Sequence, residues 1–346
     1  MERYTIPVIG IIGLLVVCTH PLWHYIAVIF SLGVIVYTCL IFASDGDVLL
    51  MMYEKFGKKA DVFKDRVVWI TGASSGIGEC LSVALAKQGA KLILSSRREK
   101  ELERVKVRCL EEGSLKSADV LVVVMDANKF DTHNSCVNQA LQHFSKIDIL
   151  INNSGVSQRS EVQNATLETD QFILNTNLIG CISLTKCILP HMMEQKTGHI
   201  INISSVAGKV GNPCSATYSA SKFGMNGYFD SFRGEVYPYN IFVTNVCPGP
   251  VSTKIVENAV QDVLGKEPIK NYDGYAERSL TLIQSGERCA ELTLVAAANR
   301  LCEIWIARPP FLILIYMAQY MPTCHRFLTQ KLGYRKVLAF RKIQQA

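Results

Sequence analysis

The sequence predicts an α/β protein in which a doubly wound parallel sheet follows an N-terminal membrane anchor. Two observations predict the sheet. Short β-rich apolar runs alternate with segments of helical periodicity after residue 65, and a glycine-rich turn follows the first of these runs. A third observation predicts the anchor, because residues 5–43 are predominantly apolar and carry no formal charge. The 346 residues suit one large α/β domain with extensions.

The anchor is placed at residues 1–45. The stretch from Leu22 to Ala43 alone reaches the ~20 residues that a membrane span needs. Residues 5–18 form a shorter apolar stretch, so the anchor has one span or two. A cleaved secretory peptide is the alternative, but its apolar core is usually only ~7–15 residues long. Lysines at 55, 58 and 59 favour a cytosolic domain, whereas long domains translocate largely regardless of local charge.

The composition excludes several classes of protein. With 49% hydrophobic and 19% charged residues, the chain is not a disordered protein. The net charge of +6 is small and includes no long basic run, so a nucleic-acid partner is not expected. None of the twelve cysteines forms a C-x-x-C pair, so we expect neither a bound metal nor a disulfide framework.

The sheet domain is placed at residues 65–306, after a linker at 46–64. Within it, Ile77, Leu81 and Leu85 repeat at helical spacing until Gly89 ends the helix. Strands that are apolar on both faces and separated by helices indicate a parallel, Rossmann-type sheet with right-handed crossovers. A C-terminal extension at 307–346, apolar and then basic, is expected to contact the membrane or a dimer partner. The predicted strands lie at residues 66–70, 91–94, 120–125, 147–151, 200–203 and 241–246.

The glycine-rich turn runs from Thr71 to Gly78 and reads TGASSGIG. Its glycines at 72, 76 and 78 permit a tight turn and let backbone N–H groups approach a pyrophosphate. The following helix presents the positive end of its dipole to that anion. The position of the turn between a strand and an amphipathic helix indicates dinucleotide binding, and its spacing is G-x-x-x-G-x-G.

With these motifs and those that follow, the chain resembles the short-chain dehydrogenase/reductase family up to about residue 306. Three further segments, at residues 101–106, 255–258 and 319–322, are similar to a membrane-anchored group within that family that acts on lipid-like carbonyl compounds. The matching motifs after the glycine turn are Asn152-Asn-Ser-Gly155, Asn177 in NLIG, Ser205 in NISSVAG, Tyr218-Ser-Ala-Ser-Lys222 and Pro248-Gly-Pro-Val-Ser-Thr253.

The Y-x-x-x-K pair has a chemical reason of its own. Tyr218 and Lys222 are four residues apart, so they share one face of a helix. A free tyrosine has a pKa near ~10, and a nearby ammonium, helped by an oxidised nicotinamide, is expected to lower that pKa toward the working range. The resemblance implies that Tyr218 protonates the substrate carbonyl and Lys222 binds the nicotinamide ribose. It also implies that Ser205 binds the substrate oxygen and that Asn177 holds a water for proton resupply.

The second strand indicates which cofactor is bound. It ends in Arg97 and Arg98 with no carboxylate, and guanidinium groups suit the 2′-phosphate of NADP(H). The resemblance favours Arg97 as the phosphate ligand and places Asp126 at the adenine. The full predicted cofactor set is Gly72, Ser74, Ser75, Gly76, Ile77, Gly78, Arg97, Arg98, Asp126, Asn152, Tyr218, Lys222, Val251 and Thr253.

Together these observations predict a membrane-anchored NADP(H)-dependent oxidoreductase that reduces carbonyl groups of steroid-, retinoid- or quinone-like substrates. Two alternatives stay open: a catalytically idle cofactor-binding membrane protein, and NAD-dependent oxidation of an alcohol. The resemblance implies an endoplasmic reticulum membrane location and a homodimer, with a small apolar carbonyl or alcohol substrate and the lipid membrane as partners. Lumenal and cytosolic placement of the domain are both compatible with the sequence.

Overall fold

The structure is a computed structural model, and it describes residues 21–58, 60–255, 257–266 and 283–333. The chain divides into two units, Met1–Ser44 and Asp45–Ala346. In the first unit, helix α2 (Pro21–Ala43) has a mean hydropathy of 2.6 over Trp23–Ala43, and no part of that window is buried. Helix α2 is therefore a candidate membrane anchor. The earlier apolar stretch at 5–18 lies outside the described residues.

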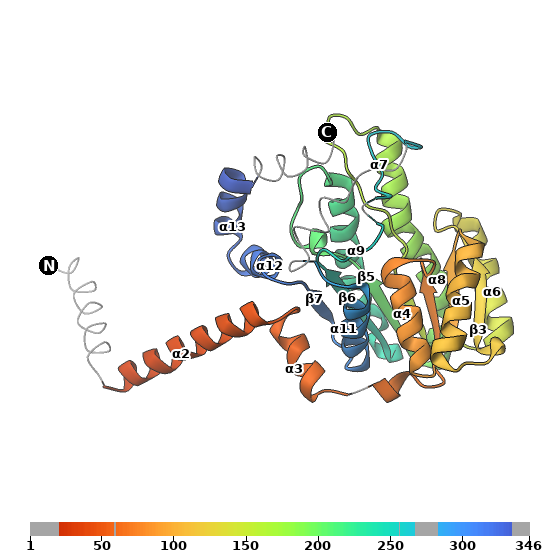
Figure 1. The fold of residues 1–346 in the computed structure, drawn as a ribbon, viewed down its shortest axis with the longest axis horizontal. Helices are drawn as coiled ribbons and strands as arrows, with labels where there is room; N and C mark the ends of the chain where they lie inside the picture. Colours follow the sequence, from red (N-terminus) through yellow and green to blue (C-terminus); the bar gives the residue numbers. More distant parts are fainter. Residues whose placement is uncertain (1–20, 59, 256, 267–282, 334–346) are drawn as a thin grey trace. The chain divides into compact units, whose positions relative to one another are not determined.

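The second unit is built on one parallel sheet of seven strands in the order β3-β2-β1-β4-β5-β6-β7 (Figure 1). This order confirms the doubly wound arrangement, because β2 and β3 are added on one side of β1 and the strands from β4 onward are added on its other side. Six strands match the predicted ones, whereas β7, which pairs with β6, was not predicted. The strands are β1 (Val67–Thr71), β2 (Lys91–Ser96), β3 (Val120–Val124), β4 (Ile149–Asn152), β5 (Gly198–Ile203), β6 (Ile241–Pro248) and β7 (Glu303–Ile306).

Helices cover both faces of the sheet, and each face has its own apolar core (Figure 1). Helices α4, α5 and α11 contribute Leu81, Leu102 and Leu292 to one core. Helices α6, α8 and α9 close the other core, in which Trp69 and Phe229 are fully buried. The bounds are α4 (Gly76–Lys87), α5 (Glu99–Gly113), α6 (His133–Phe144), α7 (Leu167–Leu174), α8 (Gly180–Gln195), α9 (Ala216–Val236) and α11 (Gly286–Ala298).

Short helical turns connect these elements. The π-helical turn η4 (Asn175–Ile179) joins α7 to α8. The end of α4 follows the prediction, because Gly89 has a φ of +73° and Ala90 N donates to Leu85 O at 3.1 Å. The other turns are η1 (Ala60–Phe63), η2 (Ser117–Asp119), η3 (Phe130–Thr132), η5 (Val206–Gly208), η6 (Tyr237–Tyr239) and η7 (Thr329–Gly333).

The segment expected to be a linker is folded onto the domain. Helix α3 (Val48–Phe56) packs against α11, and its Leu50 belongs to the core on that face of the sheet. Asp47 caps α3 by accepting from Leu50 N at 2.9 Å, and it also accepts from Trp305 N of β7 at 2.7 Å. Because these contacts are hydrogen-bonded and buried, residues 45–56 belong to the domain's own packing.

The C-terminal extension begins with two helices, α12 (Phe311–Tyr320) and α13 (Pro322–Leu328). Leu312 and Ile315 of α12 are buried, so part of the predicted apolar run packs within the unit. Tyr320, Met321 and Phe327 remain exposed. The basic residues at 335, 336, 341 and 342 lie outside the described residues.

Candidate functional site

The predicted phosphate loop is the turn between β1 and α4. Gly72 and Gly76 have φ values of +64° and +59°, which residues with a side chain rarely adopt. A Cβ at Gly78 would lie 2.3 Å from Gly72 O, so a side chain does not fit there. Helix α4 begins at Gly76 with no side-chain hydrogen bond from its N-cap Ser75, and Ile77 lies in its first turn. The positive end of α4 is therefore available to an anion.

The Asn-Asn-Ser-Gly motif after β4 is held against this turn. Thr71 Oγ1 accepts from Asn153 N at 2.9 Å and from Ser154 N at 3.0 Å. Asn153 Nδ2 in turn donates to Thr71 O at 2.9 Å. These bonds fix the carboxyl ends of β1 and β4 side by side, at the switch point where such sheets bind nucleotides.

The Pro-Gly loop after β6 reaches the same place. A Cβ on Gly76 would lie 3.2 Å from Thr253 Cγ2, so the predicted loop residue Thr253 contacts the start of α4. Val251 forms a parallel bridge with Gln284, and Gln284 N donates to Pro250 O at 3.0 Å. The loop is thus positioned by the segment that leads into α11.

The two arginines after β2 are placed differently. Arg98 Nη2 donates to Ser74 Oγ at 2.9 Å and to Ser75 Oγ at 2.8 Å, so its guanidinium lies at the phosphate loop. Arg97, which the sequence favoured, is exposed, and within the described part of the chain it forms no side-chain hydrogen bond or ion pair. Asp126 lies just beyond the end of β3, on the same edge of the sheet. The structure therefore brings Arg98, rather than Arg97, to the loop.

Asn152, expected at the cofactor, points into the sheet instead. It is 1% exposed, and its Nδ2 donates to Asn202 Oδ1 at 2.9 Å and to Thr185 Oγ1 at 3.1 Å. Asn202 Nδ2 continues the ladder to Asn245 Oδ1 at 3.0 Å, across the paired strands β4, β5 and β6. The side chain of Asn152 therefore braces the strands beneath the site, and the next residues, Asn153 and Ser154, border the loop.

Three of the predicted catalytic residues converge beyond the carboxyl end of β5. Ser205 follows β5, its hydroxyl lies beside that of Tyr218, and its Oγ donates to Pro248 O at 3.4 Å. Lys222 lies one turn beyond Tyr218 on α9, is 4% exposed, and has its Nζ 5.9 Å from the centre of the tyrosine ring. Lys222 Nζ donates to Ile203 O at 2.8 Å. The hydroxyls of Ser205 and Tyr218 thus lie together, and the Lys222 ammonium is held by the carbonyl oxygen of Ile203.

Asn177, the fourth predicted residue, is fully buried in the π-helical turn η4. Its Oδ1 accepts from Val156 N at 2.8 Å, and its Nδ2 donates to Val156 O at 3.0 Å and to Ser221 Oγ at 3.1 Å. A Cβ on Gly155 would lie 3.3 Å from Asn177 Oδ1 and 3.7 Å from Lys222 Nζ. Both polar groups therefore border one small space at Gly155, and π-bulges are frequent at functional sites.

Burial sets the protonation of the catalytic pair. Burial raises the pKa of Tyr218 above its usual value of 10, and the hydrogen bond with Ser205 offsets this only partly. Burial also lowers the pKa of Lys222 to about 8. In the protein by itself desolvation dominates, so the expected lowering of the Tyr218 pKa by Lys222 stays a prediction for the state with an oxidised nicotinamide bound. The phenol keeps its proton at neutral pH, and its raised pKa makes it a weaker proton donor than an ordinary tyrosine.

Gln158 is a site residue that the sequence argument missed. It is 2% exposed, and its Oε1 accepts from Thr217 N at 2.9 Å and from Tyr218 N at 3.1 Å. These are two of the unpaired donors in the first turn of α9, whose own N-cap Ser215 makes no side-chain cap. Gln158 thus holds the backbone of Tyr218. No sequence pattern signals it, because a capping residue normally adjoins its helix and Gln158 lies 60 residues before Tyr218.

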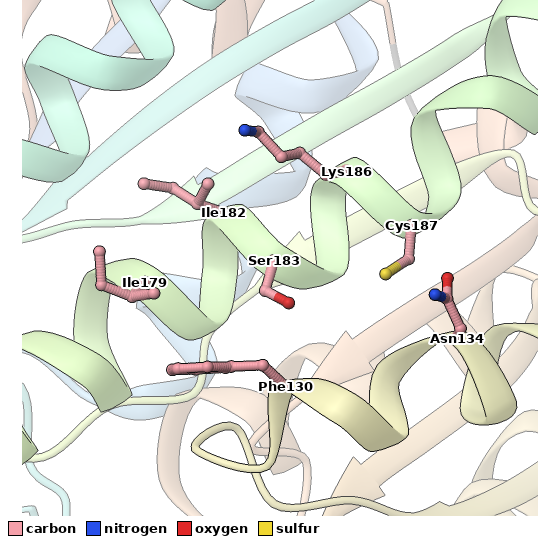
Figure 2. A pocket seen from close by; sticks show the side chains of 7 residues that line it. All are labelled: Phe130, Asn134, Ile179, Ile182, Ser183, Lys186 and Cys187. Carbon is pink, nitrogen blue, oxygen red and sulfur yellow. The ribbon is translucent and has the colours of Figure 1, made fainter.

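An open hollow lies elsewhere, between α8 and the start of α6 (Figure 2). No predicted catalytic or cofactor residue borders it. Within the described ranges, no three His, Cys, Asp or Glu side chains gather in a way that would hold a metal ion. The residues that line the hollow are Phe130, Asn134, Ile179, Ile182, Ser183, Lys186 and Cys187.

Known proteins share both the sequence and the fold. The family model for short chain dehydrogenases matches residues 66–264. The chain is 43% identical over 300 residues to the human dehydrogenase/reductase SDR family member 7, covering 86% of this chain and 87% of that protein. It is 35% identical over 264 residues to the Xenopus tropicalis family member 7B, covering 75% of this chain and 83% of that protein.

Solved structures agree with the assignment. Levodione reductase superposes with a TM-score of 0.63 at 26% identity, covering 71% of this chain and 97% of that one. A Burkholderia phymatum short chain dehydrogenase/reductase in complex with NAD gives a TM-score of 0.66 at 24% identity, covering 76% and 95%, which shows the fold alone. The matched motifs, the sheet order and these relatives lead to one conclusion: the chain belongs to the short-chain dehydrogenase/reductase family of oxidoreductases, whose fold binds a nicotinamide dinucleotide.

Proposed function

We propose that this protein is a membrane-anchored, NADP(H)-dependent reductase of lipid-like carbonyl compounds, with Tyr218 as the acid/base. The observation that carries the proposal is the arrangement of Tyr218, Ser205 and Lys222, in which a protonated phenol lies beside a serine hydroxyl and has a buried lysine one turn away. Ser205 orients the substrate oxygen and stabilises the charge that develops on it. Tyr218 donates its proton to that oxygen.

The residues around the phosphate loop fit a dinucleotide. Glycine at 78 leaves no side chain where one would collide with Gly72 O, and the first turn of α4 offers backbone donors. When bound, the reduced nicotinamide supplies a hydride to the carbonyl carbon. Lys222 and Asn177 share the space at Gly155, where Asn177 holds a water through which Lys222 resupplies the proton of Tyr218 from solvent after turnover. Lys222 also binds the ribose.

The preference for NADP(H) rests on Arg98 and its neighbour Arg97. Arg98 already lies at Ser74 and Ser75, and the exposed Arg97 adds a second guanidinium at the end of β2. No acidic side chain follows β2 directly to bind a free ribose hydroxyl and repel a phosphate. The 5-hydroxy-NADP complex of an archaeal alcohol dehydrogenase shows this fold with an NADP derivative.

The proposed substrate class is apolar because the segments beside the site expose apolar side chains. Val162 and Leu167 are 74% and 76% exposed, and Val263 and Leu264 lie on the neighbouring loop. Thr166 N donates to the carbonyl oxygen of residue 262 at 2.9 Å, which ties the two segments together. An apolar rim favours steroid-, retinoid- or quinone-like carbonyls over small polar ones.

The test is a screen of the purified full-length chain against apolar ketones and quinones, with NADPH and NADH compared at equal concentration. We expect turnover with at least one apolar carbonyl and a lower KM for NADPH. If the chain binds NADPH but no carbonyl or alcohol in the panel turns over, the idle cofactor-binding protein is the better account.

A homodimer is also proposed, and the partly apolar outer surface at Ile179 and Phe223 supports it.

The endoplasmic reticulum location, with the domain in the lumen, is proposed and has an internal reporter. Asn164-Ala-Thr166 is a glycosylation sequon, and Asn164 is exposed in the turn before α7. The other sequon asparagines, Asn152 and Asn202, are 1% and 0% exposed. We expect an endoglycosidase to shift the mobility of the wild-type chain but not of Asn164→Gln. An unmodified chain whose domain is digested in intact microsomes would place the domain in the cytosol.

A further inference from the structure

Helix α3 has two apolar faces, and the inner one is fixed to the domain. Leu50 is buried in the core, and Arg288 of α11 clamps both ends of the segment. Arg288 Nε contacts Asp45 Oδ2 at 2.9 Å, and Arg288 Nη2 donates to Glu54 Oε2 at 3.0 Å. With Asp47 also capping α3, the helix cannot rotate its outer face toward the core.

The outer face is an apolar stripe formed by Leu49, Met52, Tyr53 and Phe56. These positions are spaced i, i+3, i+4 and i+7, so they lie along one side of the helix. Their exposed fractions are 52%, 55%, 37% and 76%. A contiguous exposed apolar stripe is typical of a surface that contacts a membrane or another protein.

The charges around the stripe are of both signs. Arg288 pairs with both Asp45 and Glu54, so its single positive charge leaves one carboxylate charge uncompensated, and Asp47 is buried at the N-cap. Lys55 and Lys58 are exposed, and the Lys55 ammonium lies 5.4 Å from the centre of the Phe56 ring. An apolar stripe flanked by lysines is typical of a helix that lies in the head-group layer of a bilayer.

The short connection between α2 and α3 indicates that the stripe contacts a membrane. Helix α2 ends at Ala43 and α3 begins at Val48, so five residue steps join them. Five extended steps reach at most about 18 Å. If α2 crosses a membrane, the stripe begins within about that distance of the hydrocarbon edge.

We propose that α3 is an interfacial helix whose Leu49, Met52, Tyr53 and Phe56 lie in the head-group layer of the membrane that holds the anchor. This inference rests on the proposed anchoring of the chain. It assigns to the domain a second, fixed attachment to the lipid, which sets its orientation on the surface.

The test uses the full-length chain in phosphatidylcholine vesicles. p-Benzoylphenylalanine is placed at Phe56 in one sample and at Val107, which is 51% exposed on α5, in the control. After illumination we expect lipid adducts at position 56 to exceed those at 107 by about fivefold or more.

The outcomes separate this inference from the anchoring on which it depends. Release of the chain by alkaline carbonate would overturn the anchor and the inference together. A carbonate-resistant chain with equal adduct yields at positions 56 and 107 would overturn the inference and leave the anchor standing. Either result is independent of whether the enzyme reduces a carbonyl.

Discussion

The catalytic end and the phosphate end of the candidate site differ in how firmly the fold holds their side chains. Lys222 and Asn177 are 4% and 0% exposed, and each has a backbone partner. Arg97 and Arg98 are exposed, and only Arg98 has side-chain partners. The difference suggests that the reaction tolerates little change at the catalytic end, whereas the phosphate end sets cofactor preference and can be altered without loss of the chemistry.

The largest expected effect is at the catalytic end. Tyr218→Phe keeps the ring and removes the hydroxyl that lies beside Ser205. We expect kcat for carbonyl reduction to fall by about 10²–10⁴, because the substrate oxygen loses its proton donor. Steady-state rates with NADPH measure the effect. Retention of more than about a tenth of kcat would remove Tyr218 from its proposed role.

Lys222→Met should separate activity from stability. Burial lowers the pKa of Lys222 to about 8, so below pH 8 the folded chain holds a charge at a cost that the unfolded chain avoids. We expect activity to drop about 100-fold or more, while Tm at pH 7 rises by a few degrees.

The stability gain of Lys222→Met should shrink as pH rises from about 8 toward the unfolded lysine value of 10.5, because the folded lysine is then neutral. Thermal melts at pH 7 and 9.5 compare the two chains. A variant that is less stable than wild type at pH 7 would mean that the bond to Ile203 O outweighs the cost of burying the charge.

A smaller effect is expected at Gln158, whose Oε1 accepts from the backbone of the catalytic helix. Gln158→Leu removes the cap, at a cost of roughly 1 kcal/mol in stability. We expect kcat to fall about tenfold with little change in KM for NADPH, because misplacement of Tyr218 weakens the chemistry more than cofactor binding. Gln158→Glu keeps an acceptor for the helix but replaces the donor to Asp170 Oδ1 by a carboxylate oxygen, so we expect it to recover only part of kcat. Equal losses in both variants would argue for a role outside capping.

The smallest effect is expected at the phosphate end. Arg98→Ala should raise KM for NADPH about tenfold and leave KM for NADH nearly unchanged, since only NADPH carries a phosphate for the guanidinium. Arg97→Ala, the matched control on an arginine without side-chain partners in the described residues, should raise it less. A larger effect at Arg97 would restore the assignment made from the sequence.

Much of this site could be predicted from the sequence because its motifs are local. The glycine turn and the Y-x-x-x-K pair each lie within eight residues, and their spacing sets their geometry. The predictions that failed depend on contacts between residues far apart in the chain. Asn152 turns toward Asn202, and Gln158 caps a helix that begins 58 residues later, at Ala216. The raised pKa of Tyr218 depends on desolvation by the assembled fold.

The two elements of the fold that were not predicted, β7 and α3, also depend on distant parts of the chain. Strand β7 has only four residues, and its buried positions Ile304 and Ile306 alternate with partly buried Glu303 and Trp305. So short an alternation is weak evidence for a strand until β6 is there to pair with it. The supposed linker contains α3 because Arg288, far along the chain, supplies the ion pairs that hold it.

The most direct test of the comparison measures NADPH affinity and turnover in Tyr218→Phe and Arg98→Ala side by side. The NADPH Kd comes from quenching of protein fluorescence, and kcat comes from the substrate identified in the screen. The account predicts that Tyr218→Phe loses kcat with an unchanged Kd, and that Arg98→Ala weakens Kd about tenfold with kcat largely retained. If both variants lose affinity and turnover together, the two ends do not have separate roles, and the account is contradicted.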